Sequence, residues 1–118
     1  MTYGSAGISS SNHLSGELLA MKAGVSMTHV PYKGATPAAV DVAGGVVPVT
    51  LQGLATINSL VKAGKLRLIG VSMKSRHPAY PEAPTISDTG LPGFEFNSWF
   101  TVMAPAGTPK DIVARLQA

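Results

Sequence analysis

The stretch Tyr3-Gly4-Ser5-Ala6-Gly7-Ile8-Ser9-Ser10-Ser11-Asn12-His13-Leu14 decides how this chain folds. It begins like the end of a strand and continues as a loop of glycine and serine. From His13 to Ala23 apolar residues recur every three or four positions, which predicts a helix, and Gly24 is a typical helix stop. A strand that leads through such a loop into a helix is the first half of a βα unit.

Further short apolar runs alternate with capped helical segments along the rest of the chain. Thr36 followed by Pro37 predicts the start of a second helix, and a third is expected to stop at Gly64. A single turn is expected from Thr85 and a last helix from Thr108. The predicted strands are Met27–Val30, Val46–Leu51 (weakened by Pro48), Leu66–Val71 and Phe94–Val102. The alternation predicts an α/β fold.

Length and composition limit the number of domains and the classes of function that the chain can have. The chain has 118 residues, enough for one domain, and 45% of them are hydrophobic, enough for a core. The net charge is only +3, with no basic cluster, so nucleic acid is not an expected partner. Without cysteine, thiol catalysis, disulfides and cysteine-based zinc sites are excluded. We find no long apolar span and no signal-peptide pattern in this chain.

The glycine and serine loop has the chemistry of an anion site. Gly4 and Gly7 let backbone N–H groups turn inward, serines add hydroxyl donors, and a helix start supplies free N–H groups. An ordinary helix cap with a polar loop explains the same residues. The spacing is that of neither a P-loop, nor a dinucleotide fingerprint, nor a nucleophile elbow.

A second polar segment, His29-Val30-Pro31-Tyr32-Lys33-Gly34, ends a predicted strand. Tyr32 and Lys33 could face an acidic ligand across the first loop, but a packed tyrosine and a solvated lysine are the more common arrangement. The three histidines lack metal-ligand spacing, and structural roles are expected for them. We find no base paired with a nucleophile, and we expect no cofactor, no metal and no enzymatic activity.

Seven separated segments resemble, in order, the Bug-type (TctC-like) receptors, the extracytoplasmic solute-binding proteins of tripartite tricarboxylate transporters. They are Tyr3 to Leu14, His29 to Gly34, Ala63-Gly64-Lys65-Leu66-Arg67, Pro84-Thr85, Gly90-Leu91-Pro92-Gly93, Ser98-Trp99-Phe100 and Ala104-Pro105-Ala106-Gly107-Thr108-Pro109.

The resemblance implies one lobe of a two-lobed, class II periplasmic binding protein, with three α/β layers. Residues 1–102 would form the second ligand-binding lobe, and residues 103–118 would cross over toward a first lobe. Such a receptor works in the periplasm, captures a small carboxylate and delivers it to membrane permease subunits. We expect the full-length receptor to be a monomer, and the lobe alone to self-associate through Trp99 and Phe100.

Carried over by position, the resemblance places ligand-binding residues in three segments. They are Ser5, Ala6, Gly7, Ser9 and Ser10 in the loop, Tyr32, Lys33 and Gly34 in the turn, and Gln52. The chain has Ser9 where the family usually has glycine, and Gln52 where it often has aspartate. Since a carboxylate at the second position would suit an amino group, the neutral Gln52 predicts a di- or tricarboxylate without an amine.

Two other classes remain as alternatives. The first is the ligand-sensing domain of a regulator, because some effector domains share the two-lobed architecture, and a DNA-binding region would distinguish it. The second is a small α/β enzyme acting on an acidic substrate, which would need a base within reach of the loop.

Overall fold

The computed structural model describes residues 1–117. Its strands are β1 (Thr2–Ser5) and β2 (Thr28–Pro31). Its helices are α1 (Ser11–Ala23), α2 (Ala35–Ala43), α3 (Leu54–Lys62), the short 3-10 helix η1 (Ser87–Thr89) and α4 (Lys110–Gln117). None of the helices within residues 1–117 is both long and apolar enough to cross a membrane. The order of β1, α1, β2 and α2 confirms the predicted βα units.

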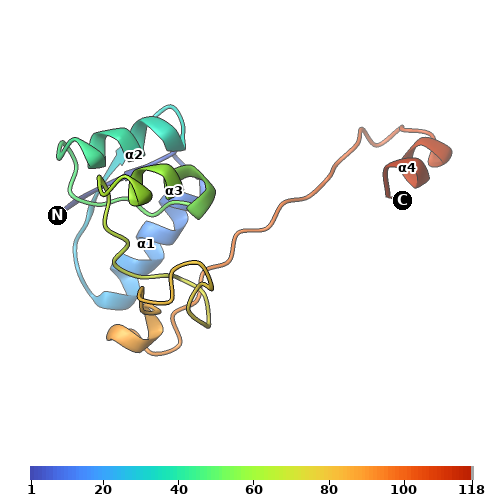
Figure 1. Cartoon of the computed structure of the whole chain (residues 1–118). Helices are drawn as coiled ribbons and strands as arrows, with labels where there is room; N and C mark the ends of the chain where they lie inside the picture. The colour runs from blue at the N-terminus through green and yellow to red at the C-terminus, as the bar shows by residue number, and fades with distance from the viewer. Residues whose placement is uncertain (118) are drawn as a thin grey trace.

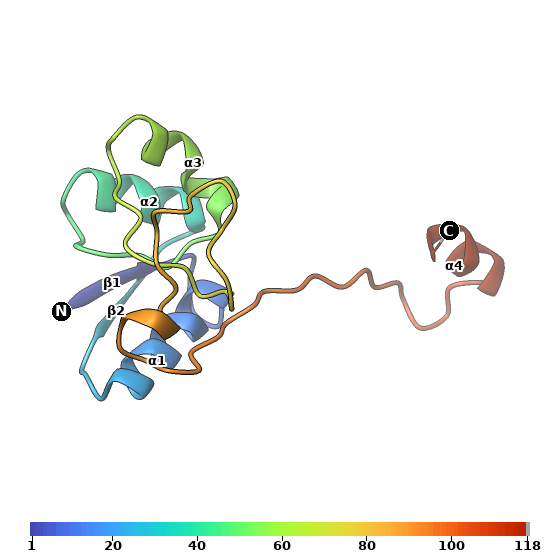
Figure 2. The same ribbon diagram turned by 60° about the horizontal axis from the view of Figure 1, so that its bottom comes forward.

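The sheet is parallel, and β1 has a neighbour on each side. Thr2–Ser5 pairs in register with Thr28–Pro31, while Gly4 also forms a parallel bridge with Thr50 on the opposite edge. Because successive strand residues point to opposite faces, Tyr3 and Ser5 face one layer and Gly4 faces the other. Figure 2 shows the resulting arrangement, with the strands between α1 on one side and α2 and α3 on the other.

Helix α1 packs on the Tyr3 face through a glycine. The Tyr3 ring is fully buried against Gly16. A β-carbon on Gly16 would lie only 2.3 Å from the Tyr3 Cε2 atom. Helix α1 begins after the N-cap Ser10 and ends at Gly24, which adopts the left-handed conformation with φ 65°. This end matches the predicted stop.

Helix α2 covers the Gly4 face with small side chains. Ala38 and Ala39 are almost fully buried, and a β-carbon on Gly4 would contact Ala38 and the Tyr32 ring. The predicted cap is wrong at this helix, because α2 begins at Ala35 with Gly34 as N-cap and already includes Thr36. Gly34 takes this place with φ 125°, a backbone conformation that favours glycine over residues with a β-carbon.

Two predicted strands do not form as continuous strands. Within Val46–Leu51 only Thr50 makes a bridge, because α2 ends in a turn at Gly44 and Gly45 and Pro48 has no N–H to donate. Within Leu66–Val71 only Val71 makes one, with Thr85. The amides of residues 67–70 have no backbone partner in the described chain, so the extended run has nothing to pair with.

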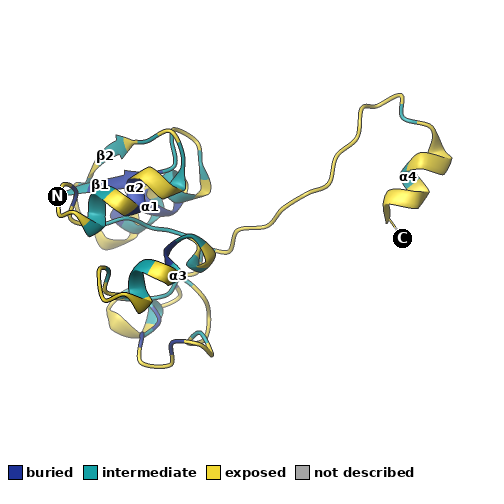
Figure 3. Ribbon diagram, turned by 45° about the horizontal axis from the view of Figure 1, so that its top comes forward, coloured by how far each residue is buried: buried dark blue, intermediate teal, exposed yellow. Residues whose placement is uncertain are grey.

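The last part of the chain leaves the body as an arm. Phe94–Val102, predicted as a strand, is tied to the body at Phe96, which exchanges hydrogen bonds with Ser72, and then runs out exposed. Figures 1 and 3 show this arm ending in α4, away from the buried residues around the strands. A strand needs a partner for its backbone groups, and the arm has none among the described residues.

Candidate functional site

Three helix starts meet at one edge of the sheet. The parallel strands β1 and β2 both end there, at Ser5 and Pro31, and lead into α1 and α2. Thr50, paired with Gly4, brings the chain to the start of α3 at the same edge. Helix N-termini carry free N–H groups and a partial positive charge, and the carboxyl edge of parallel strands is where α/β folds bind ligands.

The Ser5–Ser10 loop is held tightly from within. The Ser10 hydroxyl donates to the Gly7 carbonyl at 2.7 Å and accepts from the His13 N–H at 3.2 Å, so it caps α1. The Ser5 hydroxyl accepts from the Gly7 N–H at 3.0 Å. Gly7 adopts φ 126°, and a β-carbon there would lie 3.2 Å from the Tyr32 carbonyl, so only glycine suits this position.

Several donors of this edge are not used inside the chain. Within residues 1–117 the N–H groups of Ser11 and Asn12 in α1, and of Ala35 and Thr36 in α2, have no backbone partner. Ser9 is exposed and Ala6 is half-buried. The loop and the two helix starts thus present several N–H donors at one place, as an anion site requires.

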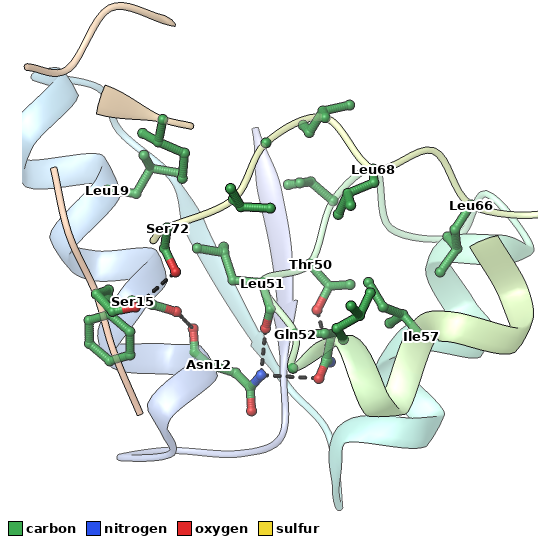
Figure 4. A pocket seen from close by; sticks show the side chains of 18 of the residues that line it. Asn12, Ser15, Leu19, Thr50, Leu51, Gln52, Ile57, Leu66, Leu68 and Ser72 are labelled. Carbon is green, nitrogen blue, oxygen red and sulfur yellow. Dashed lines mark hydrogen bonds between the residues drawn. The ribbon is translucent and has the colours of Figure 1, made fainter. Parts of the chain in front are cut away.

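Gln52 joins the helices rather than standing free. Its Nε2 donates to the Ala35 carbonyl at 3.2 Å and to the Thr50 hydroxyl at 3.0 Å, and its Oε1 accepts from Asn12 Nδ2 at 3.0 Å. Figure 4 shows Asn12 and Gln52 linked in this way. The residue that sequence reasoning placed in the ligand site therefore fixes the spacing of the α1 and α2 starts.

The turn after β2 lies directly beside the loop, because the Tyr32 N–H donates to the Ser5 carbonyl at 3.1 Å. The Tyr32 hydroxyl donates to Asp41 at 2.8 Å, and this bond, with burial and the charge of Asp41, raises the pKa of Tyr32. The tyrosine is thus occupied within the chain. Lys33 is exposed and has no ion-pair partner among the described residues.

A stack of three rings supports the loop, and sequence reasoning missed it. His29 lies between Tyr3 and His13, with ring centroids 5.2 Å and 3.9 Å apart. His13 Nδ1 accepts from the Ser9 N–H at 3.1 Å, and His29 Nε2 contacts the Ser5 hydroxyl. The pairing of Tyr3 with His29 across the two strands would have been the signal, but it needs the register, which the sequence does not give.

The Ser5 and His29 contact is a hydroxyl paired with a base, which sequence reasoning did not expect. Their Oγ and Nε2 atoms lie 2.5 Å apart. Ser5 has no exposed surface, and its hydroxyl is shared with both backbone groups of Gly7. A substrate has no access to this hydroxyl, so the pair has the features of a structural contact rather than of nucleophilic catalysis.

A cavity of about 740 Å³ lies between residues 48–54 and residues 65–73 and reaches the start of α1 at Ser11 and Asn12 (Figure 4). Of the predicted site residues only Gln52 lines it, and most of its other side chains are apolar, among them Leu19, Ile57, Leu66 and Leu68. Lys65 and Arg67 also border the cavity, but its mostly apolar lining favours an apolar group over a carboxylate. The polar edge, not this cavity, is the candidate site.

Comparison with known proteins identifies the family to which this chain belongs. The family model described as "Tripartite tricarboxylate transporter family receptor" (TctC) matches residues 1–118. The chain belongs to the TctC receptor family. Among curated relatives, it is 42% identical over its whole length to the "UPF0065 protein in tcbD-tcbE intergenic region" of Pseudomonas sp. strain P51. It is 35% identical over 92% of its length to "Protein BugT" of Bordetella pertussis.

Solved structures of TctC-like proteins share the fold. A structure described as "R. palustris Rpa4515 with adipate" is 43% identical, with a TM-score of 0.92, and covers 98% of this chain. MatC (Rpa3494) from Rhodopseudomonas palustris with bound malate is 31% identical, with a TM-score of 0.89 over 98% of this chain. The periplasmic binding protein BugD is 34% identical, with a TM-score of 0.87 over the same share. These likenesses confirm the predicted α/β lobe of a periplasmic binding protein.

The chain spans about a third of the length of these curated relatives and about two fifths of the solved structures. It covers 35% and 33% of the two curated proteins, and 39% and 40% of the adipate and malate structures. The family is one of solute-binding receptors rather than of enzymes.

Proposed function

We propose that residues 1–102 form the second ligand-binding lobe, and residues 103–118 the crossover, of a periplasmic receptor that captures a small di- or tricarboxylate for a tripartite tricarboxylate-type transporter. The observation that carries the proposal is the meeting of the α1 and α2 starts, with their unpaired N–H groups, beside the Ser5–Ser10 loop. Related structures that contain adipate and malate support the same ligand class.

The proposed ligand carboxylate lies between the loop and the Tyr32–Gly34 turn. The side chains of Ser5, Ser10 and Gln52 already form hydrogen bonds within the chain. We infer that these three side chains maintain the shape of the site. Backbone N–H groups at Ala6, Gly34 and the helix starts, with the exposed Ser9 hydroxyl, are the donors left for the carboxylate. Each hydrogen bond to a charged acceptor is worth roughly 1.5 to 3 kcal/mol.

Charge supports a ligand with more than one carboxylate. Lys33 is exposed at the edge of this site, and within the described chain no acidic side chain pairs with it. Gln52 places a neutral amide where a carboxylate would attract an amine. We therefore expect adipate, malate or citrate to bind more tightly than glutamate or aspartate.

Isothermal titration calorimetry with the full-length polypeptide that carries this sequence tests the proposal. Adipate, malate, citrate, glutamate, aspartate and a neutral diamide form the panel. We expect heat from one or more of the acids without an amine, and binding about tenfold weaker in Ser10→Ala because the loop loses its cap. Thr108→Ala, in the arm, is the control and should bind like the unchanged protein. No binding by any acid, or tight binding of amino acids alone, would contradict the proposal.

A further inference from the structure

The Ser5–Ser10 loop contains one backbone position that is costly to maintain. Ser9 adopts φ 63°, in the left-handed region that residues with a β-carbon seldom occupy. Of the described residues other than glycine, Ser9 alone has a positive φ. Something in the structure must compensate for this cost, and the Ser9 N–H shows what it is.

That N–H donates to the ring nitrogen Nδ1 of His13 at 3.1 Å. An N–H donor needs a lone pair opposite it, so this contact assigns Nδ1 of His13 as unprotonated. A protonated ring would carry a hydrogen on Nδ1, and two donors would then face each other at this distance. The hydrogen bond from the Ser9 N–H to His13 therefore forms only when the ring is neutral.

The orientation of the His13 ring is set by its neighbours. It stacks on His29 with centroids 3.9 Å apart and planes 18° apart, and Tyr3 stacks on the far side of His29. The other nitrogen, Nε2, lies 3.8 Å from the Glu17 carboxylate, which also accepts from the Tyr3 hydroxyl at 2.6 Å. Glu17, His29 and Tyr3 are the titratable groups around His13. The carboxylate attracts a charged ring, and charge on His29 would repel it.

We propose that His13 is the positioning residue of the carboxylate loop, and that it holds the loop only while its ring is neutral, so that acidification releases Ser9 and weakens ligand capture. The inference rests on the proposed function, because it concerns the same loop. Histidine is the side chain that gains a charge on mild acidification, so pH is the variable that tests this role. The receptor would then hold its solute less tightly in an acidic periplasm.

Two substitutions separate the acceptor from the ring. In His13→Asn the side-chain oxygen replaces Nδ1 as an acceptor that does not titrate, whereas in His13→Phe the stacked ring remains without an acceptor. We would measure the dissociation constants of adipate and malate by calorimetry from about pH 8 to pH 5. The unchanged protein should lose about tenfold in affinity over this range beyond the change seen in His13→Asn. His13→Phe should bind about tenfold more weakly already at the upper end. The ionisation of the ligand changes with pH in the same way in the experiments with all three proteins.

The ligand-free loop gives a second measurement, which separates this inference from the proposed function. The NMR amide signal of Ser9 should move with the titration of His13 in the unchanged protein, and it should stay constant with pH in His13→Asn. If no acid binds at any pH, the proposed function fails, and the Ser9 signal alone decides the positioning role. The positioning role would be overturned if His13→Phe bound the ligands with the affinity and pH dependence of the unchanged protein. It would also be overturned if the Ser9 signal did not change with the charge of the His13 ring.

Discussion

Residues 2–62 and residues 66–117 carry the same pattern of apolar runs and capped helical turns, yet they pack to different extents. In the first region β1 has a neighbour on each side, and α1 and α2 cover its two faces. In the second, one bridge joins Val71 to Thr85, and the chain after Phe96 runs out exposed.

The difference shows that a strand pattern in the sequence forms a strand only where another segment pairs with it. Apart from its ends, a helix pairs its N–H and C=O groups within itself, so α1, α3 and α4 form near where their sequence predicts them. A strand must find its partner elsewhere, and Leu66–Val71 has one only at its end. The following predictions disturb the packed region and use the arm as the reference.

The largest effect is expected from Gly16→Ala. A β-carbon at Gly16 would stand 2.3 Å from the buried Tyr3 ring, so α1 must shift away from the sheet. We expect the free energy of unfolding to fall by about 2 kcal/mol, even though alanine favours helix. Urea denaturation measures the change. Gly107→Ala is the control in the arm, because a β-carbon there meets nothing within 4 Å. An equal loss in both variants would show that close packing at Gly16 is not the cause.

High pH should weaken the packing of Tyr3 against α1 without a mutation. Burial, and then the hydrogen bond to Glu17 and the charge of Glu17, raise the pKa of Tyr3 well above its usual value of 10.0. The fold therefore favours the neutral ring. This stability is fully present below pH 10 and is lost as the pH rises toward the raised pKa, because the unfolded chain ionises first.

We expect Tyr3→Phe to be less stable than the unchanged chain at neutral pH but to lose less stability above pH 10. The measurement is urea denaturation at a series of alkaline pH values. Parallel curves for the two proteins would mean that the ionisation of Tyr3 does not drive the loss.

The sequence predicted the loop and the start of α1 better than it predicted the sheet. The Gly and Ser motif placed the loop before α1 correctly, because capping by Ser10 and the turn at Gly7 are local interactions. Contacts between distant segments escaped it, since the stacking of His13 on His29 and the bridge from Gln52 to Ala35 depend on the pairing of β1 with β2 and Thr50. The ligand-binding roles of the predicted residues stay predictions.

A moderate effect is expected from removing the cap of α1. In Ser10→Ala the His13 N–H loses its acceptor, and the free energy of unfolding should fall by about 1 kcal/mol. Thr108→Ala is matched to it, since the Thr108 hydroxyl only donates to the Pro105 carbonyl within the exposed arm. That variant should change stability by less than about 0.5 kcal/mol. Urea denaturation measures both, and equal losses would contradict the distinction between the two regions.

The smallest effect on stability is expected in the arm, where Trp99 and Phe100 are 79% and 99% exposed. Replacing both with serine removes almost no buried surface, so the free energy of unfolding should change by less than about 0.5 kcal/mol. The same change should reduce self-association of the chain, because an exposed aromatic pair is a typical contact surface. Sedimentation velocity over a concentration series measures the association, and urea denaturation measures the stability. A loss well above 1 kcal/mol would mean that the arm packs against the body in solution, and the contrast between the two regions would disappear.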